Sequence, residues 1–238
     1  LPHDTKAFTH GVFSGREFWD QLVFVNDEAR RIFRSLFEDH REGLLFFYFG
    51  SVDQGSHMLW HYMDGDHPNH ADDTFLKEGI RRIYERMDDV LGTVIDGIDG
   101  ETTLIVMSDH GFSPFYRGVN LNSWLLEKGY VTLFDPALPE ETEFFFDVDW
   151  SRTTAYALGL NGIYLNVKGR ETEGIVGEGA EYDRLLDRLE ADLSDLRDPR
   201  TGERAVTLVT RPRRDFHGPL RDGGPDLLVG YGRGFRSS

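Results

Sequence analysis

Two apolar runs in this chain each end in residues that can bind a metal ion. The first run, 44–49, leads to Asp53 and His57, and the second, 103–107, leads to Asp109 and His110. Continuous apolar runs of this length are typical of strands in the buried centre of a parallel sheet. Functional groups of open α/β sheets gather just beyond the carboxyl ends of such strands. The pattern therefore predicts that the four side chains share one crevice and form a metal site with two ions.

The spacing within each pair agrees with chelation. If a helix begins soon after residue 51, Asp53 and His57 lie four residues apart on one face and can bind the same ion. Asp109 and His110 are neighbours, so joint chelation requires a turn, which Gly111 can supply because glycine accepts backbone angles closed to other residues. The alternatives are aspartates that cap helices and histidines that only pack. Because two such motifs occur, each at the end of a predicted strand, metal binding is favoured over these alternatives.

Composition limits the chemistry of the site. The chain has no cysteine, so the ligands are oxygen and imidazole nitrogen, which suits Zn, Mn or Mg and leaves the choice among them open. With 42 acidic and 26 basic residues the net charge is −16, which argues against a nucleic-acid-binding surface. A phosphate substrate stays compatible, because bound metals set the local potential. No apolar stretch approaches the roughly 20 residues that span a bilayer.

The first half reads as a right-handed βαβ unit. Ser14 and Glu17 form a capping-box pattern that predicts a helix to about residue 39. Apolar residues at helical spacing predict another helix from 73 to 96, between strands at 44–51 and 103–108. A strand, a long helix and a second strand place the two strands parallel in one sheet. The expected fold class is α/β, with a parallel-sheet core flanked by helices and a smaller α+β portion.

The second half predicts shorter elements around a loop rich in Pro and Glu at 135–143. The expected elements are a helix at 120–130, a hairpin of 156–158 with 163–167, a helix at 179–196, and strands at 205–210 and 226–231. We expect a metal-bearing α/β portion over 1–140 and a smaller α+β portion over 141–238. The second portion can equally belong to the same domain as the first.

The sequences of the two motifs resemble those of a known family. The stretches FGSVDQGSHMLW (49–60) and SDHGF (108–112) resemble the alkaline phosphatase superfamily, most closely its type I phosphodiesterase/nucleotide pyrophosphatase group and the predicted phosphohydrolase/phosphomutase branch within it. Further stretches with the same resemblance are 1–6, 149–156, 166–170 and 225–230. The resemblance covers nearly the whole chain.

The resemblance implies a phosphoryl-transfer enzyme with two divalent ions. By analogy with the family, Asp53 and His57 bind one ion, and Asp109 and His110 bind the other. A Thr or Ser nucleophile on the second ion would attack phosphorus and form a phospho-enzyme that water hydrolyses. Two ions about 4 Å apart stabilise both the attacking and the leaving oxygen.

The chain departs from the family pattern at both ends. The family places an Asp and the nucleophile upstream of these motifs and a last His ligand downstream, so we expect a central fragment of a longer enzyme, inactive alone. His217 could replace the last ligand, although we interpret it as a loop residue, and His61 could flank the site. Neither Ser56 nor Ser108 is expected to be the nucleophile.

Two functions from different classes remain open. The first is a metal-dependent phosphodiesterase, phosphatase or phosphomutase that acts on a small phosphate ester. The second is a non-catalytic relative that keeps the fold as a binding or structural module. Substrate specificity in the family lies largely in variable loops, so the sequence leaves the substrate open.

Overall fold

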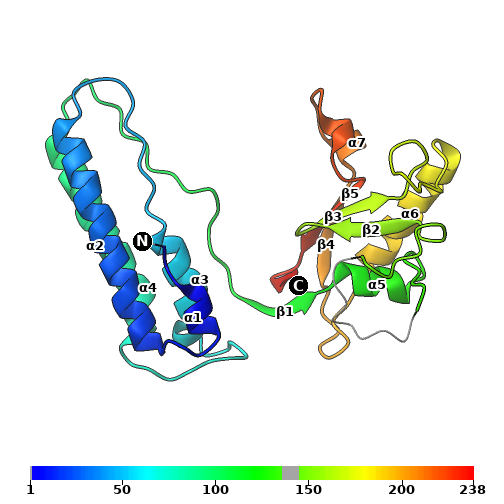
Figure 1. Cartoon of the computed structure of the whole chain (residues 1–238), viewed down its shortest axis with the longest axis horizontal. Helices are drawn as coiled ribbons and strands as arrows, with labels where there is room; N and C mark the ends of the chain where they lie inside the picture. The colour runs from blue at the N-terminus through cyan, green and yellow to red at the C-terminus, as the bar shows by residue number, and fades with distance from the viewer. Residues whose placement is uncertain (1, 136–144) are drawn as a thin grey trace. The chain divides into compact units, whose positions relative to one another are not determined.

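The computed structural model describes residues 2–135 and 145–238, which form two units, Leu1–Pro114 and Phe115–Ser238 (Figure 1). The predicted division at 140/141, like most of the predicted loop at 135–143, lies outside the described residues. The division by contacts falls earlier because strand β1 (Phe115–Val119) pairs in parallel with β6 (Gly234–Ser237) near the end of the chain. This pairing attaches the stretch after Pro114 to the second unit.

The first unit is helical. Its elements are α1 (Thr5–Thr9), α2 (Gly15–Asp39), α3 (Ser51–Met63), the 3₁₀ helix η1 (Leu76–Glu78) and α4 (Gly79–Gly97). The capping box predicted at the start of α2 is confirmed: Ser14 Oγ accepts from Glu17 N at 3.3 Å, and the Glu17 carboxylate accepts from Ser14 N at 2.8 Å. The predicted helix beginning soon after residue 51 is confirmed as α3. The helix predicted at 73–96 ends as expected but begins later, because a turn and η1 precede the first residue of α4, Gly79.

The core of this unit lies where α2, α3 and α4 meet. Phe18 and Leu22 on α2, Leu59 on α3, and Ile83 on α4 are fully buried. Each such side chain contributes about 1.5–3 kcal/mol relative to an exposed position. The three helices are therefore fixed against one another by apolar packing, and α3, which carries the first ligand motif, is held in place by Leu59.

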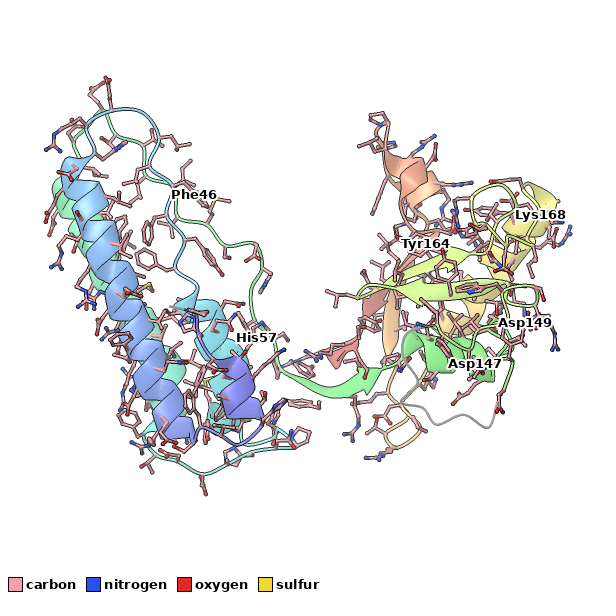
Figure 2. The ribbon with its side chains drawn as sticks, viewed as in Figure 1. Phe46, His57, Asp147, Asp149, Tyr164 and Lys168 are labelled. Carbon is pink, nitrogen blue, oxygen red and sulfur yellow. The ribbon has the colours of Figure 1, made fainter. Side chains whose placement is uncertain are left out.

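The predicted strand at 44–51 is not formed. Residues 44–49 are extended, but the structure gives them no strand pairing. Odd-numbered side chains face α2, where the rings of Phe47 and Phe49 lie 5.3 and 5.5 Å from that of Phe33. Even-numbered side chains, Phe46 among them (Figure 2), are between 67% and 91% exposed. A strand of a parallel sheet is covered on both faces, and this segment is covered on one.

The predicted strand at 103–108 is not formed either. Residues 102–108 have no strand pairing, and Ile105, Val106 and Met107 are largely exposed. The predicted parallel core through these two segments is thus wrong for the part of the chain that the structure describes. The described fold is a mixed helix and strand structure with one parallel and one antiparallel sheet, consistent with the predicted α/β class but with a small core.

The second unit is built on an antiparallel sheet with strand order β2-β3-β5-β4. Its strands are β2 (Ala155–Leu158), β3 (Gly162–Leu165), β4 (Val206–Thr210) and β5 (Leu227–Tyr231), and its helices are α5 (Leu121–Glu127), α6 (Ala180–Ser194), α7 (Pro212–Asp215) and the 3₁₀ helix η2 (Arg221–Gly223). Leu189 and Leu193 of α6 pack with Ile163 and Leu227 of the sheet in one core. The hairpin, the helices at 120–130 and 179–196, and the strands at 205–210 and 226–231 are confirmed.

A buried ionic network joins two of the stretches that carry the family resemblance. Asp226, which is 2% exposed, accepts from Arg170 at 2.9 Å on Oδ1 and 2.6 Å on Oδ2. It also accepts from the Tyr182 hydroxyl at 2.6 Å and from Leu165 N at 2.7 Å. The network ties the start of β5 to the end of β3 and to α6. The resemblance at 166–170 and 225–230 therefore falls on residues with a structural role.

A second buried side chain joins the stretch at 166–170 to the stretch at 149–156. Asn166 Nδ2 lies at 3.0 Å from the carbonyl oxygen of Trp150 and at 2.9 Å from that of Thr153. Asp149, labelled in Figure 2 on the segment before β2, accepts from the Ser151 hydroxyl at 2.6 Å. These bonds fix the chain where it enters the hairpin.

Candidate metal centre

Helix α3 presents Asp53 and His57 on the same face. His57 Nε2 lies 3.4 Å from Asp53 Oδ1, and the two side chains are 45% and 26% exposed. Figure 2 shows His57 on α3. The opposite face of α3 carries Leu59, which is buried, and Gly55. A Cβ added at Gly55 would lie only 3.1 Å from a methyl group of Leu22 on α2. Close packing against α2 thus leaves the ligand face accessible.

The second motif reaches the same place from the extended segment after α4. His110 Nε2 lies 3.6 Å from Asp109 Oδ2 and 3.9 Å from Asp53 Oδ1. The bend that turns the two side chains together lies at Asp109, and Gly111 does not adopt a positive φ. The turn expected of Gly111 is therefore made without the left-handed conformation. The structure places Asp53 close to both histidines, and Asp109 lies beside His110.

Hydrogen bonds orient the donor atoms. Gln54 Nε2 donates to Asp53 Oδ2 at 2.8 Å, so that Oδ1 is the oxygen facing the imidazoles. His110 Nδ1 lies 3.0 Å from the carbonyl oxygen of Gly111. Because a carbonyl can only accept, Nδ1 carries a proton, and in the neutral ring the lone pair of Nε2 is directed at the carboxylates. Metal-binding histidines are commonly oriented in this way.

The surroundings of His110 also favour its protonated form. The Gly111 carbonyl raises the pKa of His110 above its ordinary value, and the carboxylates of Asp109 and Asp53 raise it further. A metal ion must compete with that proton for Nε2. Binding of an ion here would therefore be stronger at higher pH.

An aromatic side chain contacts both histidines. The ring of Phe112 lies 4.9 Å from the ring of His57 and 5.6 Å from that of His110, centroid to centroid. The ring of Phe112 also lies 6.3 Å from that of Trp60, and the two ring planes are within 19° of parallel. Sequence reasoning included Phe112 and Gln54 only as neighbours of ligand residues. No spacing rule indicates these contacts, which depend on the path of the chain after His110.

Each pair of ligand residues can be compared with the ligand separation around a divalent ion. Two ligands of a tetrahedral ion with bonds of about 2.0–2.1 Å are separated by about 3.3–3.4 Å, close to the 3.4 Å between Asp53 Oδ1 and His57 Nε2. The other two separations, 3.6 and 3.9 Å, are wider. Within residues 2–135 and 145–238, no three His, Asp or Glu side chains are arranged to hold an ion together.

Other residues considered from the sequence have different surroundings. His61 stacks on Phe8, with ring centroids 6.2 Å apart, and burial lowers its pKa, as do the nearby histidines at 67 and 70. His217 lies in the second unit, between α7 and η2, and its loop role stays a prediction. Ser56 is buried, which does not suit a nucleophile that must meet substrate.

Comparison with known proteins places the chain in a family. A sequence model of the type I phosphodiesterase / nucleotide pyrophosphatase family matches residues 6–235, a range that includes both ligand motifs. No curated protein and no solved structure shows significant similarity to the chain. The family consists of phosphoric ester hydrolases that act on small phosphate esters. Within the described residues, no helix combines the length and apolar character needed to cross a membrane.

The match of the family model over residues 6–235 shows that the chain belongs to the type I phosphodiesterase / nucleotide pyrophosphatase family of the alkaline phosphatase superfamily.

Proposed function

We propose that this chain supplies metal-binding residues of a phosphoryl-transfer hydrolase that uses two divalent ions, Zn, Mn or Mg. Asp53 and His57 would hold one ion, and Asp109 and His110 the other. The observation that supports this is the meeting of the two motifs: Asp53 Oδ1 lies 3.4 Å from one imidazole nitrogen and 3.9 Å from the other. Side chains that only cap or pack have no need to converge in this way.

The proposed roles follow from the chemistry of each group. When bound, the ions would stabilise negative charge on the phosphoryl oxygens and lower the pKa of the attacking group. Asp53 and Asp109 supply the negative charge that attracts the ions. Gln54 holds Asp53 through Oδ2, and His110 gives up its Nε2 proton before it can bind.

The substrate class is a small phosphate ester. All four side chains are at least 26% exposed, so a small molecule can reach them from solvent. The chain carries a net charge of −16, so an anionic substrate must be attracted locally, by the ions themselves. This charge also disfavours a nucleic-acid polymer as substrate, because the surface lacks a basic excess.

A second candidate function is a non-catalytic relative. It is favoured by one observation, that within the described residues no three potential ligands are arranged to hold an ion together. Such a protein would keep the fold of the family while binding metal weakly or not at all.

Metal binding to the chain tests the site without relying on activity. We expect isothermal titration calorimetry to detect Zn²⁺ or Mn²⁺ binding by the wild-type protein. Asp53→Ala should weaken the binding of both ions, because Asp53 lies near both histidines. Asp109→Ala should weaken the binding of one ion. Asp96→Ala, at an exposed aspartate of α4, is the matched control and should bind as wild type does. Absence of binding to the wild type would refute the proposed site.

Turnover distinguishes the two functions. We expect the protein to hydrolyse aryl phosphate mono- or diesters in the presence of Zn²⁺, Mn²⁺ or Mg²⁺, and Asp109→Ala should abolish this activity. A protein that binds metal but hydrolyses no phosphoester would support the non-catalytic function.

A further inference from the structure

We infer that Phe112 is a positioning residue that holds the imidazoles of His57 and His110 at the metal site. The inference rests on the proposed function, and extends it from the four ligands to the group that orients two of them. Phe112 donates no ligand atom. Its role would be to restrict the rotamers of two histidines that come from different parts of the chain.

The contacts support this role because one ring touches both ligands. Phe112 meets His57 nearly edge-on, with ring planes at 72° and centroids 4.9 Å apart, and meets His110 at 60° and 5.6 Å. Edge-to-face arrangements at these distances are the favourable ones for aromatic rings. The two imidazoles are 45% and 53% exposed, so surrounding atoms leave much of each ring unrestrained. Besides the hydrogen bond of His110 to the Gly111 carbonyl and the approach of His57 to Asp53, the contact with Phe112 is therefore a restraint that the two imidazoles share.

Phe112 is itself supported from α3. The indole of Trp60 stacks nearly parallel to the Phe112 ring at 6.3 Å. Trp60 Nε1 in turn donates to Asp64 Oδ2 at 3.3 Å, and Asp64 is the residue that directly follows α3. A continuous series of contacts thus connects the end of α3 to Phe112 and from there to both histidines. The same helix supplies His57 and the platform for the ring that orients it.

The inference predicts a graded loss of metal affinity. Removing a group that orients metal ligands typically weakens binding by about 10- to 100-fold. Phe112→Leu keeps an apolar side chain but removes the ring, and we expect it to weaken Zn²⁺ or Mn²⁺ binding by about tenfold, at the low end of that range because the site is exposed. Phe112→Tyr keeps the ring and should bind within about twofold of wild type.

A matched control separates positioning from general packing. Phe8 is also half-buried and packs against a histidine, His61, that is not one of the proposed ligands. Phe8→Leu should leave metal affinity unchanged. Equal weakening by Phe8→Leu and Phe112→Leu would show that loss of packing, and not orientation, is responsible, and would overturn the inference. So would a Phe112→Leu protein that binds metal as tightly as wild type.

Measurements on the metal-free protein keep this test distinct from that of the proposed function. Proton NMR of the histidine rings should show that the His57 and His110 signals move in Phe112→Leu and return toward their wild-type positions in Phe112→Tyr, since an adjacent aromatic ring shifts them. If the wild type binds no metal, the proposed site is refuted, and the NMR comparison still decides the role of Phe112. Unchanged histidine signals in Phe112→Leu would refute it.

Discussion

Replacing Asp226 with asparagine tests the buried network of the second unit. The carboxylate is 2% exposed and accepts four hydrogen bonds, two of them from the guanidinium of Arg170. Asparagine has nearly the same shape, so the substitution changes charge and hydrogen bonding with little change in packing. Its Nδ2 group would face donors and leave part of the Arg170 charge unpaired.

The expected cost follows from these contacts. Removing one partner of a buried ion pair costs about 3–5 kcal/mol. Arg170 is 27% exposed and keeps a contact of 2.8 Å with Glu171, so part of its charge stays compensated. We therefore expect a loss of about 2–3 kcal/mol in the free energy of unfolding of this unit. At about 4 °C per kcal/mol for a unit of this size, Tm should fall by about 8–12 °C.

The assay is thermal unfolding followed by circular dichroism, with urea unfolding as a second measurement. Tyr182→Phe is the matched variant, since it removes only the hydroxyl that donates to Asp226 at 2.6 Å and should cost about 1.5 kcal/mol, the low end for a hydrogen bond to a charged group. Asp226→Asn should therefore be the more damaging of the two. If it lowers Tm by less than Tyr182→Phe, the reasoning that the paired charge dominates the network is refuted.

Three further outcomes are expected. Hydrogen bonds from Arg16 and from backbone amides lower the pKa of Asp73 from 3.8 to about 2. A carboxyl group whose pKa is lower in the folded state than in the unfolded state stabilises the fold at a pH above its unfolded-state pKa. The stability difference between wild type and Asp73→Asn, measured by urea unfolding, should thus be constant above about pH 5 and shrink toward pH 2; a difference that grows in acid would contradict this. Gly174→Ala should lower Tm, at a cost of about 1–3 kcal/mol, because the added Cβ would lie 2.1 Å from the carbonyl oxygen of Val167; an unchanged Tm would mean that the loop relaxes freely. Leu59→Ala should cost about 2–5 kcal/mol through the cavity it leaves and speed hydrogen exchange in α2, α3 and α4; unchanged exchange there would argue against the three-helix core.

Local signals in the sequence predicted the helices well. The capping box at Ser14 and the helical spacing of leucines in α6 act within a few residues, and both helices form where expected. The pairing of β1 with β6 was not predicted, because it joins segments near Phe115 and Gly234 that carry no local sign of each other. Apolar content alone also led to the wrong prediction at 44–49, since a strand needs partners that a hydrophobic run does not specify.

For the candidate site, too, the sequence predicted one part and left another unpredicted. Residue type and spacing were enough to name Asp53, His57, Asp109 and His110, because chelation requires particular atoms at particular intervals. The contacts that orient them depend on side-chain conformations set by tertiary packing. The contribution of Phe112 could therefore be inferred only from its distances to two histidine rings.

The extended segment at 44–49 also bears on how the protein behaves in concentrated solution. Its backbone has no strand partner in the structure, and one side carries the large apolar groups of Leu44, Phe46 and Tyr48. An extended, uncharged and apolar stretch of six residues is the kind of template on which identical chains stack into intermolecular sheets. The net charge of −16 opposes such stacking through repulsion between molecules. Because salt screens that repulsion, the protein should stay dispersed at low ionic strength and self-associate as salt is added.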